Sequence, residues 1–250
     1  MLALRRILTF THFTFTEYVR SGRIIIEIVA TMLFWALFLR QYPVDLSQFF
    51  SLTGIFTLLL TLYTTSSLLS LGERPQGYTI VTRPLGRHGY LLSHYFVALL
   101  VVIMMFVLIT FITVLYDQLV FKAGYTFGLG EVLKGALPLL LNVALLSSLM
   151  VLLSSLVLTN ILRLVVLAIL AIALYSQAWH LSPIFPTIQP LQSLFSWPLY
   201  PAIAGFKLAT TREFVGGARY IPLAQLALTV LLISLALSSF KRRDIILRNQ

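Results

Sequence analysis

The chain has 250 residues, of which 59% are hydrophobic and 10% are charged, and its mean hydropathy is +0.94. In a soluble domain about a quarter of the residues are charged. The composition therefore excludes a soluble domain and indicates an integral membrane protein. The net charge of +10 would favour nucleic acid as the partner of a soluble chain, but here the basic residues flank apolar runs, where they contact lipid headgroups and set the topology. We therefore expect the lipid bilayer, and no nucleic acid, as a partner.

Residues 1–23 are predicted to form an amphipathic helix in the membrane interface. On such a helix the apolar residues Leu4, Ile7, Leu8, Phe15, Tyr18 and Val19 fall mainly on one side, and Arg5, Thr9, His12, Thr16 and Arg20 fall on another. No small-residue cleavage site follows, so the segment does not read as a secretory signal. The alternative is a poorly ordered basic leader.

Six apolar runs are long enough to cross the hydrocarbon core, which takes a helix of about 20 residues. They are Ile24–Leu39, Phe49–Leu71, Tyr90–Tyr116, Leu133–Thr159, Ile161–Trp179 and Ile221–Phe240. The fourth and fifth runs are almost continuous, and we divide them at the sequence TNILR because their joint length exceeds that of a single tilted span. Glu27 lies one turn inside the first run, where we expect it to pair with Arg23 or another basic residue; a role in subunit contact is the alternative.

The distribution of lysine and arginine predicts the orientation. Six spans place both termini on one side of the membrane, and that side receives twelve of the 18 basic residues, although the loops on the other side are together longer. Both termini are therefore expected to face the cytoplasm. The predicted fold class is an all-α integral membrane protein with six transmembrane helices and an N-terminal interface helix.

Residues 180–220 differ from the other loops, because they contain five prolines among aromatic side chains and few charges. Prolines at this density forbid one regular span, so we expect short helices at the outer interface or a re-entrant piece sheltered by protein. A tethering loop is the alternative. With no internal repeat, residues 1–250 are expected to form one transmembrane domain.

The sequence lacks the motifs of several common kinds of enzyme and binding site. No G-x-x-x-x-G-K-[ST] phosphate loop is present, so we expect the chain to bind no ATP of its own. The four histidines are scattered, no H-E-x-x-H motif occurs and there is no cysteine, so a metal site or a thiol nucleophile is not expected. No G-x-S-x-G elbow appears either. The chain is therefore predicted not to be an enzyme and to hold no cofactor.

Two rows of small polar residues recur at helical spacing within predicted spans. The second span carries Thr53, Thr57, Thr61 and Thr64 or Thr65, and the fourth carries Asn142, Ser147, Ser148, Ser154 and Ser155. Such faces are typical of helix packing in membranes, which we favour over the walls of a transport pathway. Both roles are compatible if the packed faces separate during transport.

Residues 72–89 form a loop between the second and third predicted spans, on the arginine-rich side. In order they contain Glu73-Arg74, Gly77, Arg83-Pro84-Leu85 and Arg87, and Tyr90-Leu91-Leu92 follows. This order resembles the cytoplasmic loop of permease subunits of type-2 ABC transporters, in which an acidic-basic pair, Gly-Thr, a short apolar helix, Pro-apolar-x-Arg and an aromatic-Leu-Leu entry follow one another. Here Tyr78 stands where threonine is usual, and Pro75 is an addition. The amphipathic start, the six spans, the apolar outer segment and the basic tail follow the same family in outline.

The resemblance implies a permease subunit of an exporter in a prokaryotic cell membrane. It implies a pathway formed by a homodimer or with a sister permease, and separate ATPase subunits that hold ATP and magnesium on the cytoplasmic face. The residues that it implies in coupling to the ATPase are Arg74, Gly77, Tyr78, Arg83, Pro84 and Arg87.

The residues of the loop agree physically with such a role. Gly77 permits a turn, residues 78–83 favour a short helix parallel to the membrane, and Pro84 ends it. Arg83 and Arg87 suit acidic groups on a partner; contact with phospholipid headgroups is the alternative. Two other functions remain open, a scaffold or assembly factor without transport and a stand-alone secondary carrier. A carrier is expected to have charged or broken helices at mid-membrane, of which only Pro138 is a weak sign.

Overall fold

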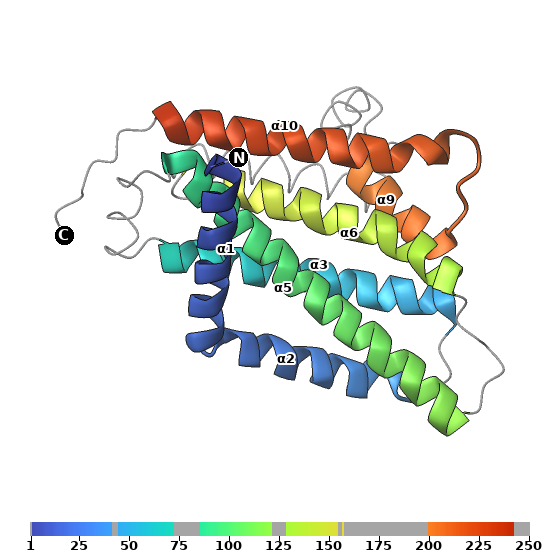
Figure 1. Ribbon diagram of the computed structural model, residues 1–250. Helices are drawn as coiled ribbons and strands as arrows, with labels where there is room; N and C mark the ends of the chain where they lie inside the picture. Colours follow the sequence, from blue (N-terminus) through green and yellow to red (C-terminus); the bar gives the residue numbers. More distant parts are fainter. Residues whose placement is uncertain are drawn as a thin grey trace, which may run out of the picture.

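The computed structural model describes residues 2–41, 45–72, 86–121, 129–154, 157 and 200–242, and helices are the regular structure of this part (Figure 1). The α-helices are α1 (Leu2–Arg20), α2 (Arg23–Phe34), α3 (Leu46–Gly72), α5 (Gly86–Tyr116), α6 (Leu129–Leu152), α9 (Tyr200–Thr211) and α10 (Ile221–Arg242). The π-helical turns η1 (Trp35–Leu39) and η2 (Asp117–Phe121) follow α2 and α5, and the 3-10 turn η5 (Gly216–Tyr220) precedes α10.

Four helical segments are long and apolar enough to cross a membrane: Leu46–Ser70, His88–Val120, Gly130–Leu152 and Gly216–Phe240. A fifth candidate is the pair Arg5–Arg20 and Arg23–Leu39, which is bent by 70° at the break between α1 and α2. The chain is thus a multi-span helical membrane protein with four or five candidate spans among the described residues. The span predicted for residues 161–179 lies outside them.

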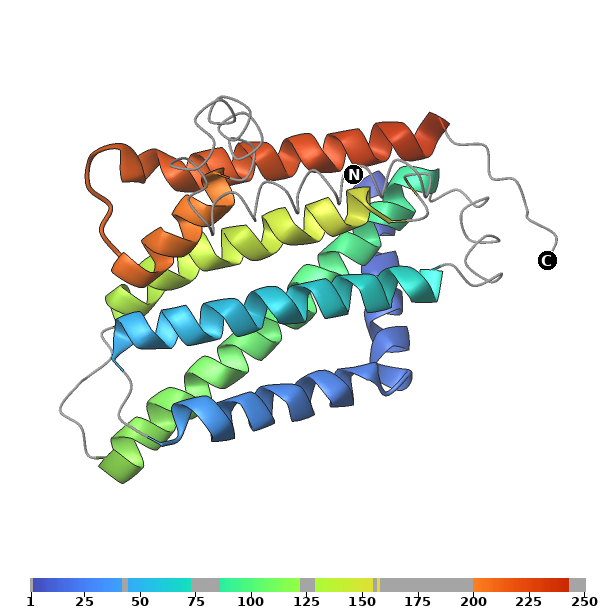
Figure 2. The ribbon, with the colours of Figure 1, turned by 180° about the vertical axis from the view of Figure 1, so that it is seen from behind.

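The ends of the long helices meet at two opposite ends of the bundle (Figures 1 and 2). One end holds α1, the start of α2, the end of α3, the start of α5 and the end of α10. The other holds η1, the start of α3, the start of α6 and the short helix α9, which packs against α6, α3 and α10. Of the segment 180–220, residues 200–211 are therefore a short helix packed into the bundle; residues 180–199 lie outside the described part.

Helix α1 runs across the bundle end at a steep angle to the long helices (Figure 1). Gly22 permits the corner because it has a φ of 75°, in the left-handed region that glycine tolerates best. The face of α1 that packs on α5 and α2 contains Thr14 and Tyr18, both buried, whereas Leu8 is 61% exposed. The predicted apolar side is thus shared: Tyr18 is buried and Phe15 packs against the cluster around it, whereas Leu8 and Val19 are exposed.

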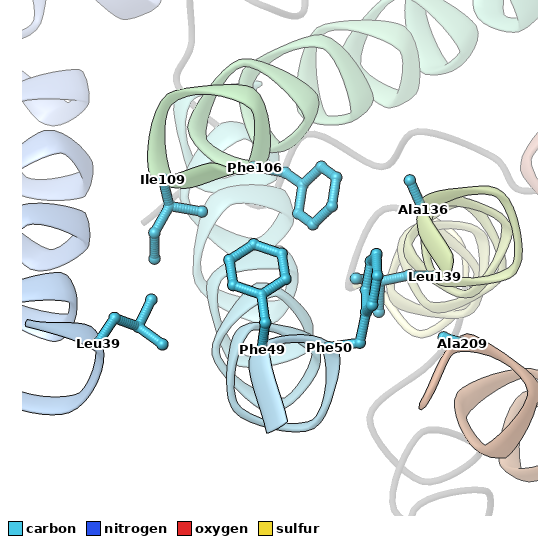
Figure 3. Close-up of a cluster of buried hydrophobic side chains, with 8 residues drawn as sticks. All are labelled: Leu39, Phe49, Phe50, Phe106, Ile109, Ala136, Leu139 and Ala209. Carbon is cyan, nitrogen blue, oxygen red and sulfur yellow. The ribbon is translucent and has the colours of Figure 1, made fainter. Parts of the chain in front are cut away.

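One hydrophobic cluster lies in the half of the bundle away from α1 (Figure 3). It joins η1, α3, α5, α6 and α9 through the buried residues Leu39, Phe49, Phe50, Phe106, Ile109, Ala136, Leu139 and Ala209. Gly135 makes room for Phe50, since a Cβ at this glycine would lie 2.3 Å from Phe50 Cε2. In a membrane such a core is stabilised by van der Waals packing and close fit. The hydrophobic effect contributes little, because lipid tails are as apolar as the side chains that they would otherwise contact.

Helix α3 begins three residues before the predicted start at Phe49. Asp45 precedes it, and its Oδ2 accepts hydrogen bonds from Ser47 Oγ at 2.7 Å and from Ser47 N at 3.3 Å. These bonds supply the cap that the first turn of a helix needs. They also hold the pKa of the Asp45 carboxyl below its ordinary value.

Two other helix ends differ from the prediction. Helix α5 begins at Gly86, so residues 86–89 of the predicted loop are already helical. Helix α6 ends at Leu152, before the predicted end at Thr159, and Ser154 lies in the turn that follows. Its Oγ and its backbone N–H both donate to the carbonyl of Val151, at 2.8 and 3.2 Å, and so satisfy this acceptor of the last turn.

Candidate functional site

The predicted coupling residues Arg74, Gly77, Tyr78, Arg83 and Pro84 lie outside the described residues, as does the predicted helix 78–83. Arg87 is in the first turn of α5. The helix ends on either side of the segment 73–85 are described, and both are at the bundle end that α1 crosses (Figures 1 and 2). The sequence motif therefore connects to that end of the molecule.

The threonine row of α3 is buried within the chain. Thr53, Thr57, Thr61, Thr64 and Thr65 are each at most 1% exposed. The hydroxyls of Thr53, Thr57 and Thr61 donate to carbonyls four residues earlier, at 2.5, 2.6 and 2.6 Å. Because their protons are used within the helix, these three residues offer a packing surface and no free donors to a solute.

The polar row predicted for the fourth span lies only in part on α6, where Asn142, Ser147 and Ser148 are buried and make different contacts. Ser154 lies in the turn beyond the helix, and Ser155 lies outside the described residues. Ser147 accepts a hydrogen bond from Thr65 at 3.3 Å, which joins the rows of α3 and α6. Ser148 donates to the carbonyl of Leu145 at 2.6 Å. Asn142 is directed to α9 instead, where its Nδ2 donates to the carbonyl of Ala202 at 2.8 Å. The predicted single narrow face is thus divided between two neighbours.

Asn142 belongs to a buried amide network that links α6, α9 and α10. Gln225 in α10 is fully buried, and its Nε2 donates to Asn142 Oδ1 at 2.7 Å and to the Pro138 carbonyl at 3.1 Å. Gly205 in α9 lies against this amide, since a Cβ there would be 1.9 Å from Gln225 Nε2. Gln225 is absent from the predicted site residues; its signal in the sequence is a lone amide within an apolar run.

A second buried network lies at the corner of α1, α2 and α3. Glu27 is fully buried, and its Oε1 accepts hydrogen bonds from Tyr18 Oη at 2.6 Å and from Thr64 Oγ1 at 2.5 Å. Its Oε2 is buried without a partner in the described part of the chain. The predicted pair with Arg23 is wrong: Arg23 Nη1 donates to the carbonyl oxygen of Ser67 at 2.5 Å. Two hydroxyls from neighbouring helices take the place that we assigned to a cation.

The described residues bring together no group of three or more His, Cys, Asp or Glu side chains that could hold a metal ion. One ion pair, Lys134 with Glu131 at 2.7 Å, lies on the surface of α6 in this part of the chain. Two buried networks of the described residues each join three helices: the network around Glu27 joins α1, α2 and α3, and the network around Gln225 joins α6, α9 and α10.

Comparison with known proteins identifies no relative: no protein-family model, no curated protein and no solved structure matches the chain.

Proposed function

We propose that the chain is the membrane-spanning permease subunit of an ATP-driven exporter of the type-2 ABC class, in a prokaryotic cell membrane. In this proposal it forms the translocation pathway as a homodimer or with a sister permease. ATP and magnesium are held by separate ATPase subunits that dock on the cytoplasmic face. The proposal rests on the sequence motif of residues 72–89 and on the position of the helix ends that flank the segment 73–85.

The observation that carries the proposal is the composition of one bundle end. Helix α1, the helix ends that flank the segment 73–85 and the end of α10 meet there (Figures 1 and 2). Six of the 18 basic residues of the chain lie in these segments, namely Arg5, Arg6, Arg20, Arg87, Lys241 and Arg242. Basic residues at the ends of spans are expected on a cytoplasmic surface. An ATPase on this face would contact the loop that carries the motif.

Coupling would proceed through the two helices that the loop connects. Helices α3 and α5 have 27 and 31 residues, so each is long enough to carry a displacement from one membrane face to the other. The buried row of α3 packs against α6 with few side-chain hydrogen bonds between the helices, of which Thr65 to Ser147 is one. A contact of this kind separates at low cost, which suits a pathway that opens only during transport.

The test is the charge reversal Arg87→Glu in the chain expressed with the ATPase of a neighbouring gene. We expect the complex to insert normally and to lose the coupling between ATP hydrolysis and transport. Arg20→Glu is the matched control, because it reverses one exposed charge at the same bundle end, outside the loop. Failure of any ATPase subunit to co-purify from the native host, together with absence of ATP-dependent flux, would refute the proposal.

A stand-alone secondary carrier is the second candidate, and the buried Glu27 favours it. A carboxyl group inside a membrane helix is costly and is typical of ion or proton pathways. The two candidates differ in their energy source. Flux driven by a pH gradient in vesicles without nucleotide, and abolished by Glu27→Gln, would select the carrier; flux that needs ATP would select the permease.

A further inference from the structure

An open groove of about 630 Å³ lies beside the corner of α2 and α3. It is lined by one face of the second half of α3, by Arg23 at the start of α2 and by Met150 near the end of α6. Figure 2 shows α3 lying between α2 and α6 on this side of the molecule. Neither the buried Glu27 nor the Gln225 network lines this groove.

The polar end of the groove is positively charged and offers unused donors. Arg23 is partly buried, and its Nη1 donates to Ser67 Oγ at 2.8 Å and to Ser70 Oγ at 3.0 Å. No carboxylate of the described residues forms an ion pair with it. Its Nε and Nη2, and the hydroxyls of Tyr63 and Ser66, have no hydrogen-bond partner in that part of the chain. Three of the side chains that line the groove thus have donors available to an anion.

The other end of the groove is apolar. Leu59, Leu62 and Met150 line this end, and Leu59 is 60% exposed. Along the exposed face of α3, Leu59 is followed one turn later by Tyr63 and then by Ser66 and Ser70. The face therefore changes from hydrocarbon to hydroxyl toward the helix end, in the direction in which a bilayer changes from acyl chains to headgroups. A molecule that fits both ends has an anionic head and a hydrocarbon tail.

We propose that this groove binds the headgroup of an anionic phospholipid, with its phosphate on Arg23 and its acyl chain along Leu59. The guanidinium suits phosphate because it presents several donors in one plane. Ser66 and Tyr63 complete the contact to the phosphate or to the glycerol oxygens. The lipid then bridges α2 and α3 and supports the corner at which Glu27 is buried. The inference does not depend on transport or on an ATPase.

The test is native mass spectrometry of the full chain in neutral detergent, titrated with dioleoyl-phosphatidylglycerol and, separately, with dioleoyl-phosphatidylcholine. We expect one phosphatidylglycerol per chain to bind more tightly than the others and more tightly than phosphatidylcholine. Arg23→Gln should weaken that binding about tenfold. Arg20→Gln is the matched control, since it removes an exposed charge three residues away and should leave the tight site unchanged.

A second variant keeps the proposal falsifiable if the loss of Arg23 disturbs the helix corner. Ser66→Phe fills the groove from an exposed position and leaves Arg23 and its bonds to Ser67 in place, so it should weaken phosphatidylglycerol binding with normal helix content. Equal binding of the two lipids would overturn the proposal, as would equal effects of Arg23→Gln and Arg20→Gln. Displacement of the lipid by inorganic phosphate at a matched concentration would also overturn it, because the site would then recognise a free anion.

Discussion

The hydrogen bond between Tyr18 and Glu27 fixes α1 to α2 across the 70° corner, and its removal should be measurable. Tyr18 Oη donates to Glu27 Oε1 at 2.6 Å, and both residues are fully buried. Tyr18→Phe deletes the donor and leaves the ring in place. The bond from Thr64 at 2.5 Å to the same oxygen remains, so the carboxyl group keeps one of its two partners.

The expected magnitude follows from hydrogen bonds between membrane helices. Such bonds contribute about 0.6 kcal/mol on average and up to about 1.7 kcal/mol, and bonds to a carboxyl group are stronger than neutral ones. We expect Tyr18→Phe to lower the free energy of unfolding by about 1 kcal/mol. Glu27→Leu leaves the tyrosine hydroxyl buried without its acceptor, a defect that Tyr18→Phe removes. The double variant should therefore cost about 1 kcal/mol less than the sum of the single variants.

The assay is unfolding in mixed micelles with a rising fraction of sodium dodecyl sulfate, followed by far-ultraviolet circular dichroism. Tyr63→Phe is the matched control, because Tyr63 is 42% exposed and its hydroxyl forms no hydrogen bond within the described residues. It should leave stability unchanged. The idea that this hydrogen bond holds α1 to α2 would be refuted by a coupling energy between Tyr18 and Glu27 below about 0.3 kcal/mol. Equal losses of stability in Tyr18→Phe and Tyr63→Phe would refute it too.

Three further predictions use the same unfolding assay. Gly205→Ala should cost about 1–3 kcal/mol, because its Cβ would overlap the amide of Gln225, and Gln225→Ala in the same chain should recover part of the loss. Gly22→Ala should cost about 1 kcal/mol through its positive φ alone, whereas Gly217→Ala, also in open space but without a positive φ, should cost nothing. Lowering the pH below about 4 should weaken the start of α3, since a depressed pKa stabilises the fold only while Asp45 is ionised; Asp45→Asn should abolish this acid dependence.

The long spans were predictable because hydropathy depends on each segment alone. The runs from Phe49, Tyr90, Leu133 and Ile221 all correspond to helices of membrane length. Their ends were less predictable, since a cap such as Asp45 adds residues to a helix without any change in hydropathy. The burial of the threonine row also follows from its period on α3.

The partners of the buried polar groups were not predictable. A charge next to Glu27 in the sequence suggested an ion pair with Arg23, but the 70° corner brings Tyr18 to that carboxyl group. The corner depends on the backbone of Gly22 and on the packing of α1 against α5, neither of which a helical pattern encodes. Likewise, Gln225 and Asn142 are 83 residues apart in the chain, and only the tertiary fold makes them neighbours.

The threonine hydroxyls of α3 that donate within their own helix affect which substitutions the protein can accept during evolution. The hydroxyls of Thr53, Thr57 and Thr61 donate to carbonyls of their own helix. Replacement of any of these threonines by valine would therefore remove no hydrogen bond to another helix. Relatives with the same packing can therefore lose the whole threonine row through neutral exchanges. Glu27 and Gln225 are different, because a substitution at either residue leaves a buried polar atom of a neighbouring helix without its hydrogen-bond partner. Distant relatives should be sought by these two residues and their partners, and not by the hydroxyl pattern.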